Sequence, residues 1–176
     1  MPDISFRQAT PSDAVCIAVL ATQVFLDTYA IEGIRLQLAN EALENYSPGA
    51  LSALLAKPGV SFIIAERTSH LIAFAQLTDD STHHLLGSGL FTELNRLYVQ
   101  RPFTRRGIGK SLIQRAEARA SAQGATALWL TAWADNHRAL AFYASQGYKD
   151  LGATPFSYQG DDYENRVLAK ALPSRR

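Results

Sequence analysis

The chain has 176 residues, of which 47% are hydrophobic and 19% are charged. These values are typical of a globular protein with its own core, and they exclude disordered and collagen-like classes. The 17 basic residues nearly balance the 16 acidic ones, so no broad electrostatic surface for nucleic acid or for a membrane is expected. We predict one domain over residues 1–172 and a C-terminal tail over 173–176.

The first residues resemble no secretory signal, and no stretch approaches the ~18 apolar residues of a membrane span. A soluble, cytoplasmic protein is therefore expected. The single cysteine, Cys16, lies in an apolar helical run and can form no internal disulfide. We expect it to be a buried, inert thiol.

The N-terminal half begins with the alternating strand 4–8, and Thr10 and Pro11 then start a helix that runs to about Tyr29. Two shorter helical pieces cover 41–46 and 48–56. The apolar runs 60–66 and 71–78 flank a polar turn and predict a hairpin.

The C-terminal half contains a strand over 91–99 and a helix that begins at Gly107 and ends at Gly124. A strand over 127–133, a helix over 136–146, a strand starting at Tyr148 and a short strand over 164–169 follow. The predicted order is therefore strand, helices, three strands, helix, strand, helix and two strands, which indicates a mixed α/β (α+β) protein.

A glycine-bearing basic turn joins the strand 91–99 to the following helix. Gly107 and Gly109 let the backbone approach a ligand closely, and the first N–H groups of the helix lack partners within it. The helix dipole adds partial positive charge, while Arg105, Arg106 and Lys110 add full charges. The turn is thus predicted to bind a phosphate group.

Two nucleotide-binding motifs fit this turn poorly. Gly109, Lys110 and Ser111 match the end of a P-loop, but Thr104 occupies the place of its leading glycine. A dinucleotide loop needs glycine or alanine where Leu112 stands. A P-loop nucleotide-binding protein remains a remote alternative.

A second motif, from Asn136 to Tyr148, reads N-x-x-A-x-x-F-Y-x-x-x-G-Y. Together with the glycine turn it resembles the GNAT family of N-acetyltransferases, whose turn reads Q/R-x-x-G-x-G/A. The resemblance covers about residues 91–149, and Thr104 departs from it in place of Gln or Arg. It implies a mixed, mostly antiparallel central sheet of about seven strands flanked by helices. It also implies direct acetyl transfer from acetyl-CoA to a primary amine, without a metal.

The resemblance also assigns roles to residues around acetyl-CoA. The backbone amides of the turn would hold the pyrophosphate, the strand before it would lie along the pantetheine arm, and the Val99 N–H would stabilise the oxyanion. Asn136 would cap its helix or bond the pantetheine arm. The residues expected to bind acetyl-CoA are Leu97, Tyr98, Val99, Thr104, Arg105, Arg106, Gly107, Ile108, Gly109, Lys110, Asn136 and Tyr143.

Two side chains are candidates for proton transfer. The resemblance implies that Tyr143 protonates the departing thiolate, and the ordinary pKa of tyrosine, near 10, makes it a proton donor at neutral pH. Glu93 is expected to help deprotonate the amine. The alternatives are a core aromatic for Tyr143 and, for Glu93, a surface glutamate or one that is ion-paired with Arg96 or Arg101.

Short motifs around Asp27, Tyr29 and Trp133 resemble bacterial polyamine N-acetyltransferases of the spermidine/spermine type. A polyamine-like small amine is therefore the favoured acceptor, with Asp27, Tyr29 and Trp133 as its expected contacts. Asp161 and Asp162 are expected to form a polar turn, with contact to the amine as the alternative. A protein N-terminus or an aminoglycoside remains an alternative, as does a non-catalytic acyl-CoA sensor. His83 and His84 lack further ligands for a metal site. The protein is expected to be a monomer or a homodimer.

Overall fold

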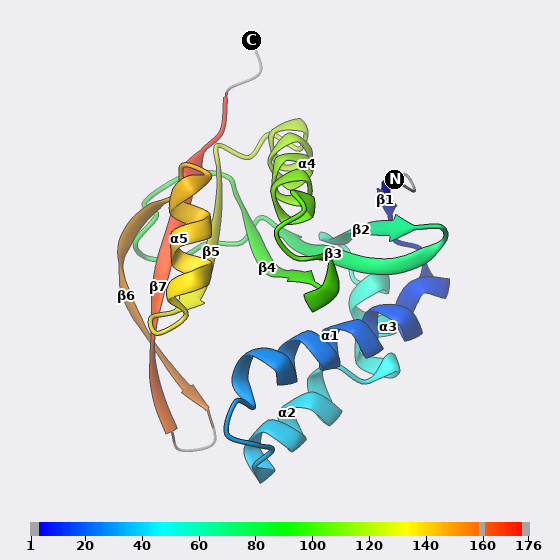
Figure 1. Ribbon diagram of the computed structural model, residues 1–176. Helices are drawn as coiled ribbons and strands as arrows, with labels where there is room; N and C mark the ends of the chain where they lie inside the picture. The colour runs from blue at the N-terminus through cyan, green and yellow to red at the C-terminus, as the bar shows by residue number, and fades with distance from the viewer. Residues whose placement is uncertain (1–3, 159–160, 174–176) are drawn as a thin grey trace. The chain divides into compact units, whose positions relative to one another are not determined.

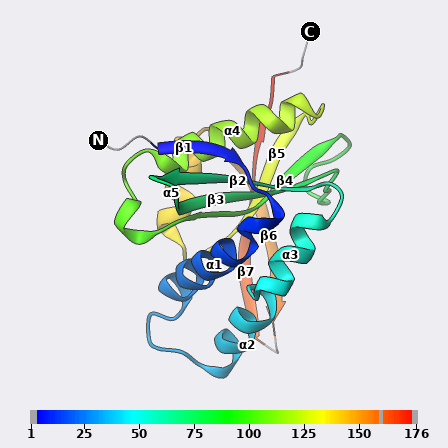
Figure 2. The same cartoon turned by 90° about the vertical axis from the view of Figure 1, so that its right-hand side faces the viewer.

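The computed structural model describes residues 4–158 and 161–173 and shows a mixed α/β protein (Figure 1, Figure 2). The N-terminal elements are β1 (Ile4–Gln8), the 3₁₀ helix η1 (Pro11–Asp13), α1 (Ala14–Tyr29), α2 (Leu36–Asn45), α3 (Pro48–Ala56), β2 (Val60–Arg67) and β3 (His70–Asp79). The C-terminal elements are β4 (Phe91–Val99), the 3₁₀ helix η2 (Arg101–Phe103), α4 (Ile108–Ala122), β5 (Ala127–Trp133), α5 (His137–Ser145), β6 (Lys149–Tyr158) and β7 (Asp161–Ala171).

The seven strands form one sheet in the order β1-β2-β3-β4-β5-β7-β6. The pairs β1–β2, β5–β7 and β6–β7 are antiparallel, whereas β4 and β5, which α4 connects, are parallel. The predicted mixed, mostly antiparallel sheet of about seven strands with flanking helices is therefore confirmed. Among the described residues, no helix has both the length and the apolar character needed to cross a membrane.

The chain forms two compact units, and the first contains the N-terminal residues up to Leu77 together with Arg96–Arg115. Its core brings α1, α2 and α3 against β2 and β3 (Figure 2). Alternate strand residues point into this core, such as Phe62, Ile64 and Phe74, each at most 1% exposed. This unit holds the glycine turn.

The second unit contains Thr78–Asn95 and the chain from Ala116 onward. Phe91, Trp129 and Val167 form its apolar cluster, one from each of β4, β5 and β7. The hairpin of β6 and β7 carries a bulge between Asp150 and Gly152. This unit holds Glu93, Trp133 and Tyr143.

Most predicted elements lie where the sequence placed them, but three differ. Helix α2 begins at Leu36 instead of residue 41, and β7 begins at Asp161 instead of residue 164. The 3₁₀ helix η2 was not predicted. Helix α2 begins without a side-chain cap hydrogen bond at Arg35, so its first residue carries no capping signal.

The prediction for Cys16 is wrong, because its side chain is exposed. Helix α1 buries one face through Ile17, Ala18 and Ala21, at 0 to 2% exposure, and Cys16 lies on another face beside the exposed Val15 and Val19. The apolar run thus covers more of the helix than the core can bury.

The carboxylate of Asp13 takes part in the N-terminal cap of η1 and also forms an ion pair with Arg7 of β1. It accepts the Thr10 N–H at 2.7 Å and both terminal nitrogens of Arg7 at 2.8 Å. Hydrogen bonds from Arg7, and then from Thr10, hold the pKa of Asp13 well below its usual range. Its charge therefore stabilises the fold above the unfolded-state pKa near 4, and this contribution is lost as the pH falls below that value.

We expect Asp13→Asn to lower the free energy of unfolding by about 1 kcal/mol at pH 7, because the amide keeps the shape but loses the charge. Urea unfolding at pH 7 and pH 3 checks this, and the difference from the wild type should shrink at pH 3. Asp80→Asn, an exposed position, serves as the control. A difference that persists unchanged at pH 3 would contradict the electrostatic explanation.

Candidate functional site

The glycine turn in the first unit has an unusual backbone. Arg105 and Gly107 both have positive φ, at 61° and 79°. Such a conformation is open to glycine but strained for arginine. Helix α4 then begins, and its first intrahelical bond joins the Ser111 N–H to the Gly107 carbonyl at 2.9 Å. The N–H groups of residues 108–110 precede this bond and have no helical partner, as a phosphate-binding turn requires.

Thr104, the residue that departs from the family pattern, has a role within the turn. Its hydroxyl donates to the Arg101 carbonyl at 2.9 Å, closing η2. The side chain therefore stabilises the conformation of the loop. The turn also carries three basic side chains.

These cations are Arg105, Arg106 and Lys110, all exposed. The Arg106 guanidinium lies over the Phe103 ring, 5.7 Å from its centroid, and Arg67 lies 5.9 Å from the same ring. Cation–π contact with Phe103 restrains Arg106 near the turn. Ile108, 2% exposed, anchors the first turn of α4 in the core.

The first half of β4 pairs with β5 over a short parallel ladder. Within the second unit, this ladder runs from Phe91 with Ala127 to Glu93 with Trp129, and it does not include Leu94 or Asn95.

The first unit holds three predicted ligands on β4, of which Leu97 and Val99 are half-buried. Tyr98 packs against the core, with its hydroxyl 3.1 Å from that of Tyr46. Burial, followed by the proximity of Tyr46, raises the pKa of Tyr98 well above its ordinary value. Contact of Tyr98 with a ligand would therefore involve its backbone.

Glu93 is half-buried, and its carboxylate accepts the Ser81 hydroxyl at 2.7 Å. In the first unit, Arg96 donates a hydrogen bond to the Gln76 side chain. Sequence reasoning missed Ser81, which comes from the loop after β3. A single serine in a polar loop gives no signal of this contact.

Tyr143 is buried at 9% exposure on α5, with ring centroids 5.3 Å from Phe142 and 5.7 Å from Tyr148, both in edge-on contact. Tyr148 donates its hydroxyl to Glu117 at 3.1 Å, and burial followed by Glu117 raises its pKa. Asn136 caps α5 by accepting the Ala139 N–H at 3.1 Å, which confirms its predicted capping role.

The candidate acceptor residues are divided between the units. In the first, Asp27 is exposed and Tyr29 stacks on Phe25 at 5.1 Å. Burial, and then the proximity of Tyr46 and Glu41, raises the pKa of Tyr29. In the second, Trp133 ends β5, and its carbonyl accepts the Asn136 N–H at 3.0 Å.

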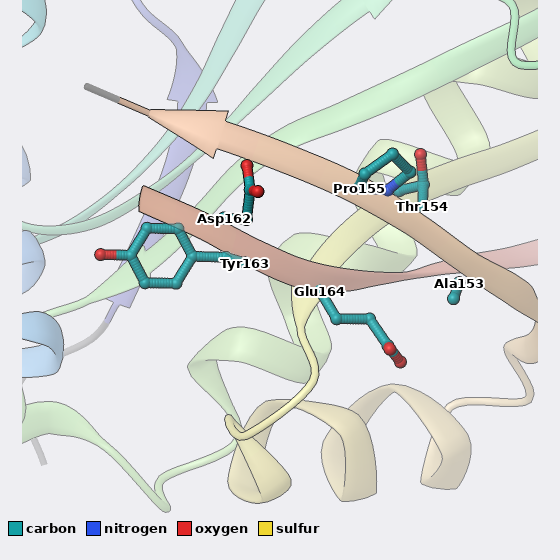
Figure 3. A pocket seen from close by; sticks show the side chains of 6 residues that line it. All are labelled: Ala153, Thr154, Pro155, Asp162, Tyr163 and Glu164. Carbon is teal, nitrogen blue, oxygen red and sulfur yellow. The ribbon is translucent and has the colours of Figure 1, made fainter. Parts of the chain in front are cut away.

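A hollow of about 390 Å³ lies on the hairpin of β6 and β7 (Figure 3). It is lined by Ala153, Thr154, Pro155, Asp162, Tyr163 and Glu164. Its two carboxylates already have partners: Asp162 accepts the Ser157 hydroxyl, and Glu164 pairs with Arg166 at 3.2 Å. The side chain of Asp161, the other predicted contact in this hairpin, lies outside the described residues.

The paired histidines lie beside this hairpin. His83 is half-buried, stacks on Trp129 at 5.4 Å and contacts the Thr154 hydroxyl at 3.3 Å, whereas His84 is exposed. Within the part of the chain that the structure describes, no three His, Cys, Asp or Glu side chains are grouped to hold a metal ion.

Known proteins are similar to this chain over nearly its whole length. An IAA acetyltransferase from Azospirillum brasilense is 33% identical over 98% of this chain and 100% of its own. An uncharacterized N-acetyltransferase from Lactobacillus delbrueckii subsp. lactis is 24% identical over 98% of this chain and 99% of its own. The crystal structure of PaiA N-acetyltransferase from Thermoplasma acidophilum, in complex with coenzyme A, superimposes with a TM-score of 0.76 at 23% identity, covering 97% and 99% of the two chains.

The sequence profile of the acetyltransferase (GNAT) family matches residues 26–148, which include the glycine turn and the motif that starts at Asn136. The TM-score of 0.76 shows that the chain shares its fold with the PaiA enzyme. The chain therefore belongs to the GNAT family of acetyltransferases.

Proposed function

We propose that this protein transfers an acetyl group from acetyl-CoA directly to a primary amine of a small molecule. The observation that carries the proposal is the turn before α4, where Gly107 in the left-handed region leads into N–H groups without helical partners. Family membership and the coenzyme A complex of the PaiA enzyme support the same donor.

On the donor side, the amides of residues 108–110 bind the pyrophosphate, with Arg105, Arg106 and Lys110 supplying charge. The half-buried Leu97 and Val99 lie along the pantetheine arm, and the Val99 N–H donates to the acetyl oxygen as negative charge develops there. Thr104 acts only by fixing the loop.

The acceptor nitrogen must lose two protons over the reaction, and the departing sulfur must gain one. Glu93 takes the first proton from the ammonium form of the acceptor, through a water where the distance requires it, and Ser81 orients its carboxylate. The amine nitrogen then bonds to the acetyl carbon as the carbonyl electrons move onto the oxygen. Collapse of this oxyanion breaks the carbon–sulfur bond, and the nitrogen releases its second proton to solvent. Tyr143 donates a proton to the departing thiolate, so that coenzyme A leaves as the neutral thiol.

The acceptor is an amine whose class the family does not fix. A polyamine-like amine is the class that the short motifs around Asp27, Tyr29 and Trp133 predict. The exposed carboxylate of Asp27, close to the end of α1, suits a second ammonium group of such a substrate.

Thiol release from acetyl-CoA, measured over polyamines, amino acids, peptides and aminoglycosides, tests this function. We expect release with at least one amine, together with thermal stabilisation by acetyl-CoA and none by ATP with magnesium. Stabilisation by ATP alone would instead favour a nucleotide-binding protein. Stabilisation by acetyl-CoA without release from any amine would indicate an acyl-CoA sensor.

A further inference from the structure

Arg96 places a positive charge inside the first unit, on the face of β4 that it shares with Tyr98. Its guanidinium lies 5.0 Å from the centroid of the Tyr46 ring. One terminal nitrogen donates to the side-chain carbonyl of Gln76, which is itself 3% exposed. Arg96 is half-buried and held from two sides by side chains that are almost completely buried.

No carboxylate neutralises this charge within the described residues. Three other arginines, Arg7, Arg119 and Arg166, each form an ion pair with an aspartate. Among the residues that the structure describes, Arg96 forms a hydrogen bond with Gln76 alone, although a guanidinium offers five N–H donors. A partly desolvated cation without a counterion is unfavourable, so its open donors are suited to a negatively charged ligand.

The tyrosines nearby do not supply the missing charge. Burial and the neighbouring Tyr46 raise the pKa of Tyr98 and outweigh the opposite effect of Arg96, so this phenol stays neutral. The two hydroxyls, 3.1 Å apart, instead offer hydrogen bonds. The cluster of Arg96, Gln76, Tyr46 and Tyr98 therefore has the composition of an anion-binding group: one cation, polar hydrogen-bonding groups and no negative charge.

Arg96 lies three residues before Val99, so the two are separated by roughly 10 Å along the strand. We propose that Arg96 binds a carboxylate of the acceptor. This inference rests on the proposed acetyl transfer at Val99. The substrate class is an amine that carries a carboxylate several bonds from its reactive nitrogen. The planar guanidinium matches the two carboxylate oxygens in a forked pair. A second ammonium group at the same place would be repelled, so this inference keeps the proposed acetyl transfer but replaces the polyamine-like acceptor, which the motifs around Asp27 favour, with an amine that carries a carboxylate.

Three acceptors of equal chain length separate these classes: 6-aminohexanoate, hexylamine and 1,6-diaminohexane. For the wild type we expect kcat/KM for 6-aminohexanoate to exceed that for hexylamine by about tenfold or more, which is about 1.4 kcal/mol. In Arg96→Met the ratio should fall to about one, and Arg96→Lys should keep part of the preference. Arg115→Met is the matched control, since Arg115 is exposed in the same unit and contacts only Phe6 and its own helix among the described residues.

The ratio compares two substrates with the same enzyme preparation, so it does not depend on the folded fraction of a variant. A wild-type ratio near one, a ratio unchanged in Arg96→Met, or the diamine as the fastest substrate would each overturn the proposal. Calorimetry of the products 6-acetamidohexanoate and N-hexylacetamide, with coenzyme A present, gives a second test without turnover. Equal affinity for the two products, or binding of neither, counts against the Arg96 site. If acetyl-CoA itself fails to bind, the proposed function fails instead.

Discussion

The Gly109→Trp variant is expected to lose affinity for coenzyme A by about a hundredfold or more, equivalent to about 2.7 kcal/mol. Gly109 is the second residue of α4 and is half-buried in its first turn. A phosphate bound by the amides of residues 108–110 must approach the backbone closely at this point. An indole there would occupy that space and keep the phosphate away from the donors. Titration calorimetry with coenzyme A measures the loss.

The matched control is Gln114→Trp, which adds the same side chain to an exposed position further along the same helix. It should bind coenzyme A as the wild type does. If Gly109→Trp retains its affinity while its melting temperature is unchanged, the phosphate does not bind at this turn. Loss of affinity in both variants would point to a general effect on α4.

Replacement of Tyr143 by Phe is expected to lower kcat about tenfold or more, because general acid catalysis by a positioned group commonly contributes more than this. Affinity for coenzyme A should change little. The ring of Tyr143 is fixed by its edge-on contacts with Phe142 and Tyr148, and phenylalanine retains those contacts. A thiol-release assay at saturating acetyl-CoA gives kcat, and calorimetry gives the affinity.

Tyr148→Phe provides the comparison, since this tyrosine is also buried, at 5% exposure, and donates its hydroxyl to Glu117. Loss of that bond should lower the free energy of unfolding by about 1 kcal/mol. Its kcat should stay close to that of the wild type, because Lys170 still neutralises Glu117. Unchanged turnover in Tyr143→Phe would remove the acid role, and equal loss in both variants would indicate a packing effect.

The sequence predicted the elements that have strong local signals. Strand β4 and helix α3 begin and end where the pattern places them, and Asn136 caps α5 as its position in the motif indicates. The turn before α4 was predicted from its glycines, and Gly107 indeed has positive φ. In each case the relevant information lies within a few consecutive residues.

What the sequence could not predict depends on contacts between distant residues. Asp162 has a low strand propensity, yet it belongs to β7 because it pairs opposite Ser157 of β6. The environment of Arg96 combines Gln76 from β3 with Tyr46 from the end of α2, which lie 20 and 50 residues away. One local signal was present in the sequence: Arg96 lies on the same face of its strand as Leu94 and Tyr98, because every second residue of a strand points to the same side. Only the fold shows that no carboxylate among the described residues accompanies it.

The exposed thiol of Cys16 has a practical consequence for measurements on this protein. The sequence contains one cysteine, and its side chain is accessible on α1. A maleimide reagent should therefore modify the native chain at a single sulfur atom, on a helix face that does not pack in the core. The same accessibility allows two chains to join through a disulfide in an oxidising buffer. A dimer that is observed only without reductant is thus explained by a disulfide between two Cys16 side chains. A dimer that persists with reductant is held together by a non-covalent interface.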